Sequence, residues 1–414
     1  MNALKIYNSD IIKYTFLLNL SLILNYFFWF INSPDFLKIL NFLFIIVLSV
    51  IFIISPVLKN YFYVKILFSL LFLLILGSPS FSHDLRSIYL FTSKILFYNP
   101  NFFETINSYN YDVQKWFDVV NTRPRIVSSL SSSFALLIGF WNEIFPKTTN
   151  LFFMLAPILF LSSFFKNKNS QLLFFLLILF LTGKIIVLGL NDGLLGLYFI
   201  STLILLFYII ENPKKKNIKF YYFYLFLFAS ILTLIKTEGT VMLFSITSTY
   251  LFFNIYKNKK LNPFIILSLF CSFIPIIMWR FGNYLNSSVI ESFQEGNPFL
   301  RLFENIFIFE NYKIFFHFLI TNDKLLISIF LFAVAIFFFK NKRNYFLNFL
   351  ILNIILYFIL LVLSYFTSSY GVFVTLTTSS GRTFIPIMIV MVYYFVYILD
   401  RSDFNFKNKF YFIP

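Results

Sequence analysis

Four short motifs place ionisable side chains at the borders of long apolar runs. An ionisable group is unfavourable in hydrocarbon, so one that stands beside an apolar run is by default a hypothesis of function. Acids and bases together suit a substrate that carries a phosphate group, because cations would hold the phosphate and a carboxylate would accept a proton. The motifs are Ser82-His83-Asp84-Leu85-Arg86, Asn191-Asp192-Gly193, Lys236-Thr237-Glu238-Gly239 and Gly381-Arg382-Thr383.

Each motif also has a purely structural interpretation. Asp84 could cap the helix that follows it, and Asp192 stands among turn-forming residues between two apolar runs. Lys236 and Gly239 interrupt an apolar stretch in the way that a helical hairpin would. Arg382 could reach the membrane surface from the start of the last apolar run. The sequence alone leaves both interpretations open at all four positions.

The composition requires a membrane to position these motifs. The chain has 414 residues, of which 59% are hydrophobic and only 12% are charged, and Phe alone contributes 65. Its mean hydropathy is +0.83. A soluble protein of this size needs a charged surface that this chain cannot supply, so it is a polytopic membrane protein.

Other classes of function lack their signatures. The net charge is +16, but no nucleic-acid-binding motif accompanies it, so we expect no nucleic acid as a partner. The single Cys271 and the two histidines, His83 and His317, argue against disulfides and a thiolate or histidine metal site. No P-loop, HExxH or GxSxG motif occurs, which argues against nucleotide-driven transport, zinc proteolysis and serine hydrolysis.

The apolar runs predict an all-α bundle of about 12 membrane spans, treated as one domain over residues 1–414. A spanning helix needs about 20 mostly apolar residues, and the continuous runs exclude a β-barrel. The predicted spans are 15–31, 39–57, 62–78, 149–165, 171–189, 193–210, 220–236, 239–256, 262–279, 325–339, 345–364 and 383–399.

The basic residues predict the orientation of the bundle. Short connections rich in Lys alternate along the chain with connections that are less basic or mixed in sign. The positive-inside rule then places both termini in the cytoplasm and the two long loops, 79–148 and 280–324, outside. All four motifs fall on the outer side, which we expect to be the outer face of a bacterial inner membrane.

One apolar segment conflicts with this count. Residues 126–141 are apolar enough to cross the membrane, but a crossing there would turn every later basic loop outward. We therefore predict a re-entrant or interfacial helix, which five serines within 128–133 also favour. The stretch 85–98 is predicted to be another interfacial helix, with Ile88, Phe91 and Ile95 on its apolar face and Lys94 off that face.

The motifs, taken in order, resemble those of the GT-C membrane glycosyltransferases. The closest branch is the one of the protein mannosyltransferases and the lipid A aminoarabinose transferase. The resemblance covers about residues 80–240 and 380–390. The matching stretches are Asp84-Leu85-Arg86 with Lys94, Arg123-Pro124-Arg125 leading to Gly139-Phe140-Trp141-Asn142-Glu143, Gly189-Leu190-Asn191-Asp192, Lys236-Thr237-Glu238-Gly239, and Arg382 with Pro386.

This resemblance implies inverting transfer of a sugar from a polyprenyl-phosphate carrier to a lipid, glycan or protein acceptor on the outer face. Asp84 would act as general base, and Asp192 would orient the acceptor or hold a divalent cation. Fixed cations would stabilise the leaving phosphate. The predicted substrate-binding residues are Lys94, Arg123, Arg125, Lys236, Glu238, Arg280 and Arg382, with Arg382 and Lys236 closest to the phosphate.

Two other functions remain open at this stage. A polysaccharide polymerase or O-antigen ligase is also multi-spanning, with long outer loops. A transporter or flippase of lipid-linked sugars would bury its charges in the middle of its spans. The transferase makes a geometric prediction that separates it from both: Asp84, Asp192, Lys236 and Arg382 should converge beside a lipid-facing groove.

Overall fold

The structure is a computed structural model. It describes residues 4–55, 61–77, 91–99, 102–103, 124–187, 190–215, 217–257, 260–286, 297–338, 345–368, 372–373 and 382–401. In these ranges the regular structure is helical and contains no strand, which confirms the predicted all-α class there. The helices are α1 Ser9–Phe30, α2 Asp35–Ile54, α3 Phe62–Gly77, α4 Phe91–Tyr98, α6 Ile126–Ile138, α7 Ile144–Ser162, α8 Lys168–Val187, α9 Asp192–Glu211, α10 Ile218–Ile235, α11 Glu238–Tyr256, α12 Pro263–Cys271, α13 Ile274–Asn286, α14 Pro298–Ile306, α15 Phe309–Thr321, α16 Asp323–Phe338, α17 Tyr345–Phe366 and α19 Ile385–Arg401.

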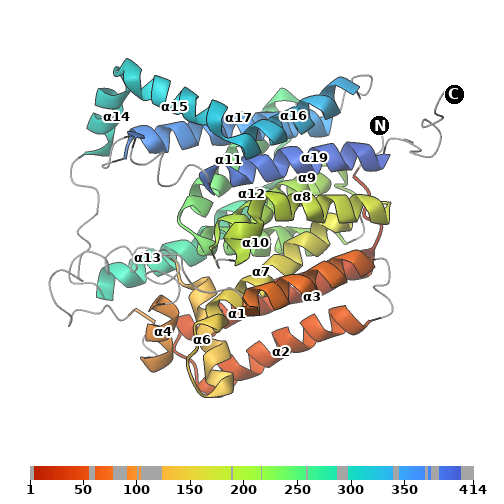
Figure 1. Cartoon of the computed structure of the whole chain (residues 1–414), viewed down its shortest axis with the longest axis vertical. Coiled ribbons are helices and arrows are strands. Elements are labelled where there is room, and N and C mark those ends of the chain that lie inside the picture. Colours follow the sequence, from red (N-terminus) through yellow and green to blue (C-terminus); the bar gives the residue numbers. More distant parts are fainter. Residues whose placement is uncertain are drawn as a thin grey trace.

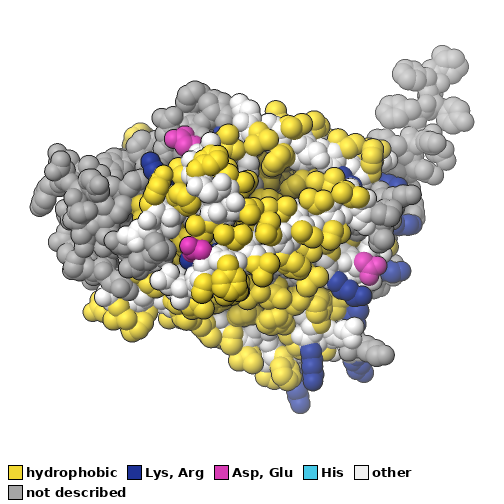
Figure 2. Space-filling model, turned by 90° about the horizontal axis from the view of Figure 1, so that it is seen from below, with side chains coloured by type: hydrophobic (Ala, Val, Ile, Leu, Met, Phe, Trp, Pro, Cys, Tyr) yellow, Lys and Arg dark blue, Asp and Glu magenta, His cyan; other side chains and the backbone are white. Residues whose placement is uncertain are grey.

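The long helices lie side by side and run between two ends of the molecule (Figure 1). One end carries both chain termini, and α3, α8 and α10 begin there while α2, α9 and α19 finish there. We call it the basic end, because it holds Lys65, Lys168, Lys214, Lys215 and Arg401. Figure 2 shows most of the Lys and Arg side chains of one face gathered toward this end. The opposite end is called the site end.

In the described part of the chain, six helical segments are long and apolar enough to cross a membrane, by length and composition. They are Ser9–Phe30, Asp35–Ile54, Asp192–Glu211, Ile218–Ile235, Pro263–Leu285 and Tyr345–Phe366. Each of the twelve predicted ranges is largely helical in its described part, but the other helices do not meet the criterion over their described residues. An integral membrane protein is therefore supported, whereas the count of twelve spans stays a prediction.

The predicted second outer loop, 280–324, is largely helical in its described part. It contains the end of α13, all of α14 and all of α15. Helix α15 and the following α16 would pass as one span together, but they are bent by 71° at their junction. Such a pair is either a broken span or a re-entrant element. The place of these helices relative to a membrane stays a prediction.

Helix α6 occupies the segment 126–141 that sequence reasoning could not assign to a span. Its 13 residues extend about 20 Å at 1.5 Å per residue, which is less than the roughly 30 Å of a hydrocarbon core. The helix ends at Gly139, whose φ of 86° lies in the left-handed region that favours glycine. Its length is compatible with the predicted re-entrant or interfacial position.

The serines of α6 face protein, as their number predicts. All five are buried. Ser133 Oγ accepts hydrogen bonds from Asn25 and from Trp29 Nε1 of α1 at 3.0 and 2.8 Å. Ser132 donates to the Ser93 carbonyl of α4 at 2.8 Å. Polar groups of α6 are thus satisfied by neighbouring helices, which an apolar surface of lipid could not do.

The predicted helix over 85–98 is described from Phe91 to Tyr98, as α4. Thr92, Ser93 and Leu96 are buried, while Ile95 is only half-buried. Helix α4 packs against the serine-rich α6, and the apolar face toward the membrane stays a prediction. Lys94 is exposed, as predicted.

Helix α9 lies at the centre of the bundle. Every residue from Asp192 to Ile210 is buried, because α7, α8, α10, α11, α17 and α19 all pack against it. A continuous apolar sequence fits a helix enclosed on all sides. Its first residue, Asp192, is therefore held at the site end with protein around it.

Candidate functional site

Four charged residues from three parts of the chain meet at the site end. Lys236 Nζ lies 2.9 Å from Asp192 Oδ1 and 2.7 Å from Glu238 Oε1. Arg382 Nη1 lies 3.9 Å from Asp192 Oδ2. We call Asp192, Lys236, Glu238 and Arg382 the charge cluster. Three of the predicted motifs, separated by up to 190 residues of sequence, supply it.

The start of α9 holds the Asp192 carboxylate. Asp192 is the first residue of the helix, and Leu195 N donates to the Asn191 carbonyl at 2.9 Å in the first turn. The positive end of the helix dipole therefore faces the carboxylate. Because the residue is only 4% exposed, this fixed dipole and two nearby cations replace water as its environment.

A sharp break between α10 and α11 turns Lys236 toward Asp192. Lys236 ends α10 in an extended conformation, with φ −160° and ψ 152°. Glu238 then opens α11, and Gly239 N donates to the Lys236 carbonyl at 2.9 Å. A Cβ at Gly239 would stand 1.9 Å from the carbonyl oxygen of Leu232. Only glycine permits this approach, so it fixes where Lys236 and Glu238 point.

A second close approach brings Arg382 into the cluster. A Cβ at Gly196 of α9 would stand 2.7 Å from Ile389 Cδ1 and 3.3 Å from Pro386 Cα, both in α19. The two helices therefore pack closely one turn away from Asp192 and from Arg382. Without a side chain at 196, α19 reaches the position from which the guanidinium approaches the carboxylate.

Two side chains of the charge cluster are buried, and the other two are partly exposed. The side chains of Asp192 and Lys236 are 5% and 8% exposed, whereas those of Arg382 and Glu238 are 28% and 40% exposed. The inner pair is thus protected from water, and the outer pair is accessible to a ligand. The formal charges of the four groups sum to zero, with the Lys236 ammonium between two carboxylates.

The ammonium of Lys236 also bears on the divalent cation that sequence reasoning left open at Asp192. In the described part of the chain, no group of three or more His, Cys, Asp or Glu side chains is arranged to hold a metal. The two carboxylates of the cluster already share Lys236. A metal ion between the two carboxylates would have to displace the Lys236 ammonium, so these residues do not fit a bound metal ion.

Three hydroxyl groups border the cluster, and of these residues the sequence motifs include only Thr383. Tyr357 donates to the Thr383 carbonyl at 3.4 Å, and the Tyr365 hydroxyl bonds to Thr383 Oγ1. Tyr357 is close enough to Glu238 and Asp192 for their charges to act on it. The sequence signal for Tyr357 and Tyr365 was their spacing of eight residues, which puts both on one face of α17.

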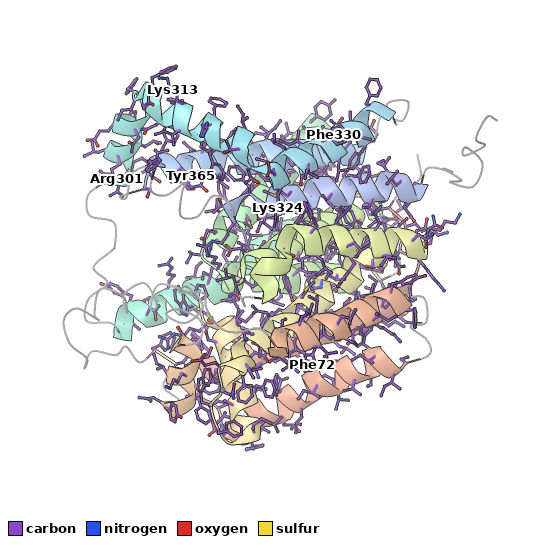
Figure 3. All side chains as sticks on the ribbon, in the orientation of Figure 1. Phe72, Arg301, Lys313, Lys324, Phe330 and Tyr365 are labelled. Carbon is purple, nitrogen blue, oxygen red and sulfur yellow. The ribbon has the colours of Figure 1, made fainter. Side chains whose placement is uncertain are left out.

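Helix α14 is hydrogen-bonded to the backbone at the end of α17. Arg301 Nε donates to the Thr367 carbonyl at 2.9 Å, and Asn305 donates to the Phe366 carbonyl at 2.8 Å. Figure 3 shows Arg301 and Tyr365 near each other at the site end. The end of α17, with its tyrosine beside Thr383, is thereby tied to the second predicted outer loop.

One buried amide beside the cluster has unused hydrogen-bonding capacity. Asn191 is 1% exposed, and neither its amide nitrogen nor its amide oxygen has a hydrogen-bond partner among the described residues. Leaving such a group unsatisfied is unfavourable by about 1–3 kcal/mol. Asn191 directly precedes Asp192 in the sequence.

The other predicted site residues lie apart from the cluster or outside the described residues. Asp84 and Arg123 are outside them. Arg125 is buried and donates to the Phe102 carbonyl. Burial lowers the pKa of its guanidinium to about 10, so it keeps its charge at neutral pH. Its contact with Phe102 packs the chain before α6, and its predicted part in substrate binding stays a prediction.

Two further cations of the predicted site are exposed. Lys94 lies on the outer side of α4. Arg280 lies on α13, with its guanidinium 5.1 Å from the centre of the Trp279 ring. No described ion pair joins either residue to the charge cluster. Their predicted part in binding the substrate therefore stays a prediction too.

No protein-family model, curated protein or solved structure matches this chain significantly. The geometry of the site is thus the main support for a function. Three of the four residues predicted to converge, Asp192, Lys236 and Arg382, do so, and Asp84 is outside the described residues.

Proposed function

We propose that this protein is a membrane glycosyltransferase. It moves a sugar from a polyprenyl-phosphate carrier to a lipid, glycan or protein acceptor on the outer face of the membrane. The observation that carries the proposal is the charge cluster, which joins Asp192, Lys236, Glu238 and Arg382 at the end of the bundle opposite the basic end. Positive-inside topology makes that end the outer one.

The reaction needs one base and one site for a leaving phosphate. The acceptor oxygen bonds to the anomeric carbon, and the bond from that carbon to the phosphate oxygen breaks with its electron pair. The proton of the acceptor hydroxyl passes to a carboxylate. Asp84 is the proposed base, from the family resemblance. Glu238, whose side chain is 40% exposed, is the carboxylate of the cluster that an acceptor reaches most readily.

The two cations of the cluster take different parts in this proposal. Arg382 is the more exposed one, and its planar guanidinium suits two oxygens of a phosphate. Lys236 is enclosed by two carboxylates, so we assign to it the positioning of Asp192 and Glu238. This assignment differs from the sequence-based expectation that both cations contact the phosphate.

A reaction in detergent solution tests the proposal against transport. The purified chain is mixed with a polyprenyl-phosphate sugar and candidate acceptors, and the products are weighed by mass spectrometry. A transferase adds one sugar to the acceptor even when no sealed compartment exists. A flippase only moves the lipid across a bilayer, so it yields no product under these conditions.

Three variants assign the roles, with one matched control. Asp84→Asn should abolish transfer while leaving expression intact. Arg382→Gln should lower the rate about 100-fold or more, the usual effect of removing one preorganised group that stabilises developing charge. Glu238→Gln reports whether this carboxylate takes part. Asp323→Asn, at the exposed start of α16 at the same end, should leave the rate unchanged.

The same variants can be read in cells. A strain that lacks the gene should lose the mass of one sugar from an envelope glycan, and the intact gene should restore it. Unchanged glycans in the deletion strain, together with no product in detergent, would exclude the proposed activity. Full transfer by Asp84→Asn would remove only the assignment of the base.

A further inference from the structure

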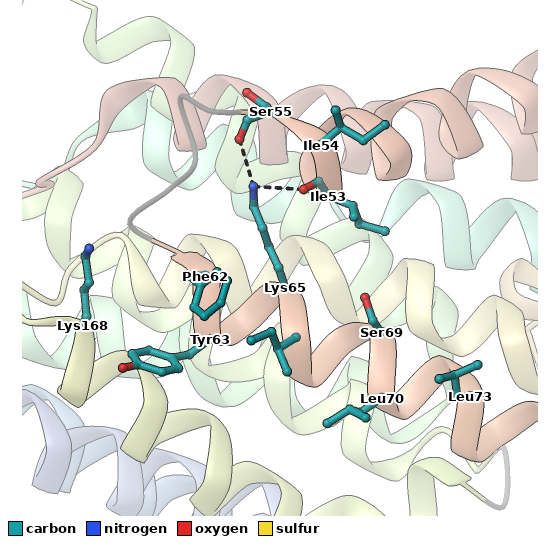
Figure 4. Close-up of a pocket in the computed structure, with 11 residues that line it drawn as sticks. Ile53, Ile54, Ser55, Phe62, Tyr63, Lys65, Ser69, Leu70, Leu73 and Lys168 are labelled. Carbon is teal, nitrogen blue, oxygen red and sulfur yellow. Dashed lines mark hydrogen bonds between the residues drawn. The ribbon is translucent and has the colours of Figure 1, made fainter.

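A groove opens at the basic end, far from the charge cluster. It lies between the last turn of α2, the first turns of α3 and the start of α8, and its volume is about 820 Å³ (Figure 4). Helix α2 packs mainly against α1 and α6, whereas α3 packs against α7 and α8. Since these partners lie on different sides, a space is left between the ends of α2 and α3.

Two lysines give the groove a positive charge. Lys65 Nζ donates to the carbonyls of Ile53 and Ser55 at 3.1 and 2.9 Å, as the dashed lines in Figure 4 show. Both acceptors are neutral, so they orient the ammonium without cancelling its charge. Lys168, at the start of α8, lines the same groove and is exposed. Among the described residues no acidic side chain lines the groove or pairs with either lysine.

The rest of the lining is apolar and exposed. Ile54 is 74% exposed and Leu73 is 62% exposed. Along α3 the lining residues Ile66, Leu70 and Leu73 follow one another at helical spacing, so they form one face that leads from the lysines toward the middle of the bundle. The groove therefore has two lysines at its entrance and an apolar lining along the rest of its extent.

We propose that this groove binds an anionic glycerophospholipid. The phosphodiester lies between the ammonium groups of Lys65 and Lys168, and an acyl chain lies along Leu70 and Leu73. The carbonyls of α2 use two of the three N–H groups of Lys65, so one remains to donate to the phosphate. A basic pocket between helices at the membrane surface attracts anionic head groups, and a choline head group would bring a third cation to the two lysines.

Lipid binding to the purified full chain tests this proposal. The delipidated protein in neutral detergent is titrated with fluorescent phosphatidylglycerol and, separately, with phosphatidylcholine of the same acyl chains. We expect tighter binding of phosphatidylglycerol. Lys65→Gln and Lys168→Gln should each weaken it about fivefold, and the double variant about 25-fold, from the usual attraction of one cation near an anionic surface.

Two further variants serve as controls. Lys13→Gln removes a lysine from the same end, where Lys13 is exposed and pairs with Asp10, and should leave the affinity unchanged. Lys65→Arg keeps the charge beside the α2 carbonyls and should retain most of the affinity. If Lys65→Gln fails to fold, Lys168→Gln carries the test, because Lys168 is exposed.

Three results would overturn the proposal. One is equal affinity for the two lipids. Another is a loss in Lys13→Gln as large as that in Lys168→Gln, which would indicate a general effect of surface charge. The third is displacement of phosphatidylglycerol by an equal concentration of polyprenyl phosphate, which would assign the groove to a carrier lipid. None of these results bears on the charge cluster at the opposite end.

Discussion

Removing the ammonium of Lys236 should destabilise the protein more than any other single change in the charge cluster. In Lys236→Met the carboxylates of Asp192 and Glu238 lose the cation between them. Their nearest oxygens lie within 2.9 and 2.7 Å of the same nitrogen, so they are at most about 5.6 Å apart. At an effective dielectric constant of about 20, two negative charges at that distance repel by roughly 3 kcal/mol.

Burial sets the size of the effect. The side chains of Asp192 and Lys236 are 5% and 8% exposed, and breaking a buried pair by removing one partner destabilises by about 3–5 kcal/mol. Removing both charges together, in Asp192→Asn with Lys236→Met, leaves no buried ion without a partner. We therefore expect the double variant to be less destabilised than the sum of the two single variants, by about 2 kcal/mol or more.

Unfolding in mixed micelles with increasing SDS measures these free energies for the four members of the cycle. An exposed pair gives the matched control. Lys313 and Glu310 are 3.1 Å apart with side chains 60% and 64% exposed, so the same cycle there should give a coupling of about 0.5 kcal/mol or less. Equal couplings in the two cycles would refute the view that Lys236 holds a buried carboxylate.

Two other predictions concern backbone contact and topology. Gly239→Ala should destabilise by about 2 kcal/mol or more, because the new methyl group would meet the backbone of α10. Gly183→Ala has open space around its Cβ and should be neutral or better in the same SDS titration; equal losses would contradict the contact. In a Cys271→Ser background, Asp323→Cys should react with an impermeant maleimide in intact cells, whereas Lys214→Cys should react only after permeabilisation. The reverse pattern would invert the orientation and place the charge cluster in the cytoplasm.

Charge position along the sequence was enough to predict which groups would share one end of the bundle. Asp192 opens one helix, Lys236 closes the next and Arg382 precedes the last. Antiparallel packing of consecutive helices then puts all three at the same end. The alternation of lysine-rich connections fixed that end as the one away from the basic loops.

The internal geometry of the cluster could not be predicted from the sequence. Sequence reasoning turned Lys236 toward a phosphate, whereas the structure places its ammonium between two carboxylates. That arrangement depends on an extended backbone at Lys236 and on the contact of Gly239 with the last turn of α10. The spacing of the motifs in the sequence indicates neither the extended backbone nor this contact. For the same reason, sequence reasoning treated Tyr357 and Tyr365 as ordinary aromatic residues of an apolar helix.

Hydropathy identified the helices better than it identified the spans. An apolar run looks the same whether lipid or protein surrounds it. Helix α9 is apolar and fully buried, whereas α2 is apolar and largely exposed. The five serines of α6 did predict a polar or protein-packed setting, but not that α1, α4 and α7 would be the helices that bury them.

The order of the helices along the chain has a consequence for biosynthesis. The inner pair, Asp192 and Lys236, is complete once α9 and α10 have been made, but Arg382 is translated almost 150 residues later. Helix α19 must then enter beside α8, α9 and α16, which are already present. A nascent chain therefore carries two carboxylates and one ammonium, with a net charge of −1, until the last helix inserts, and Arg382 arrives only when the bundle around it is finished.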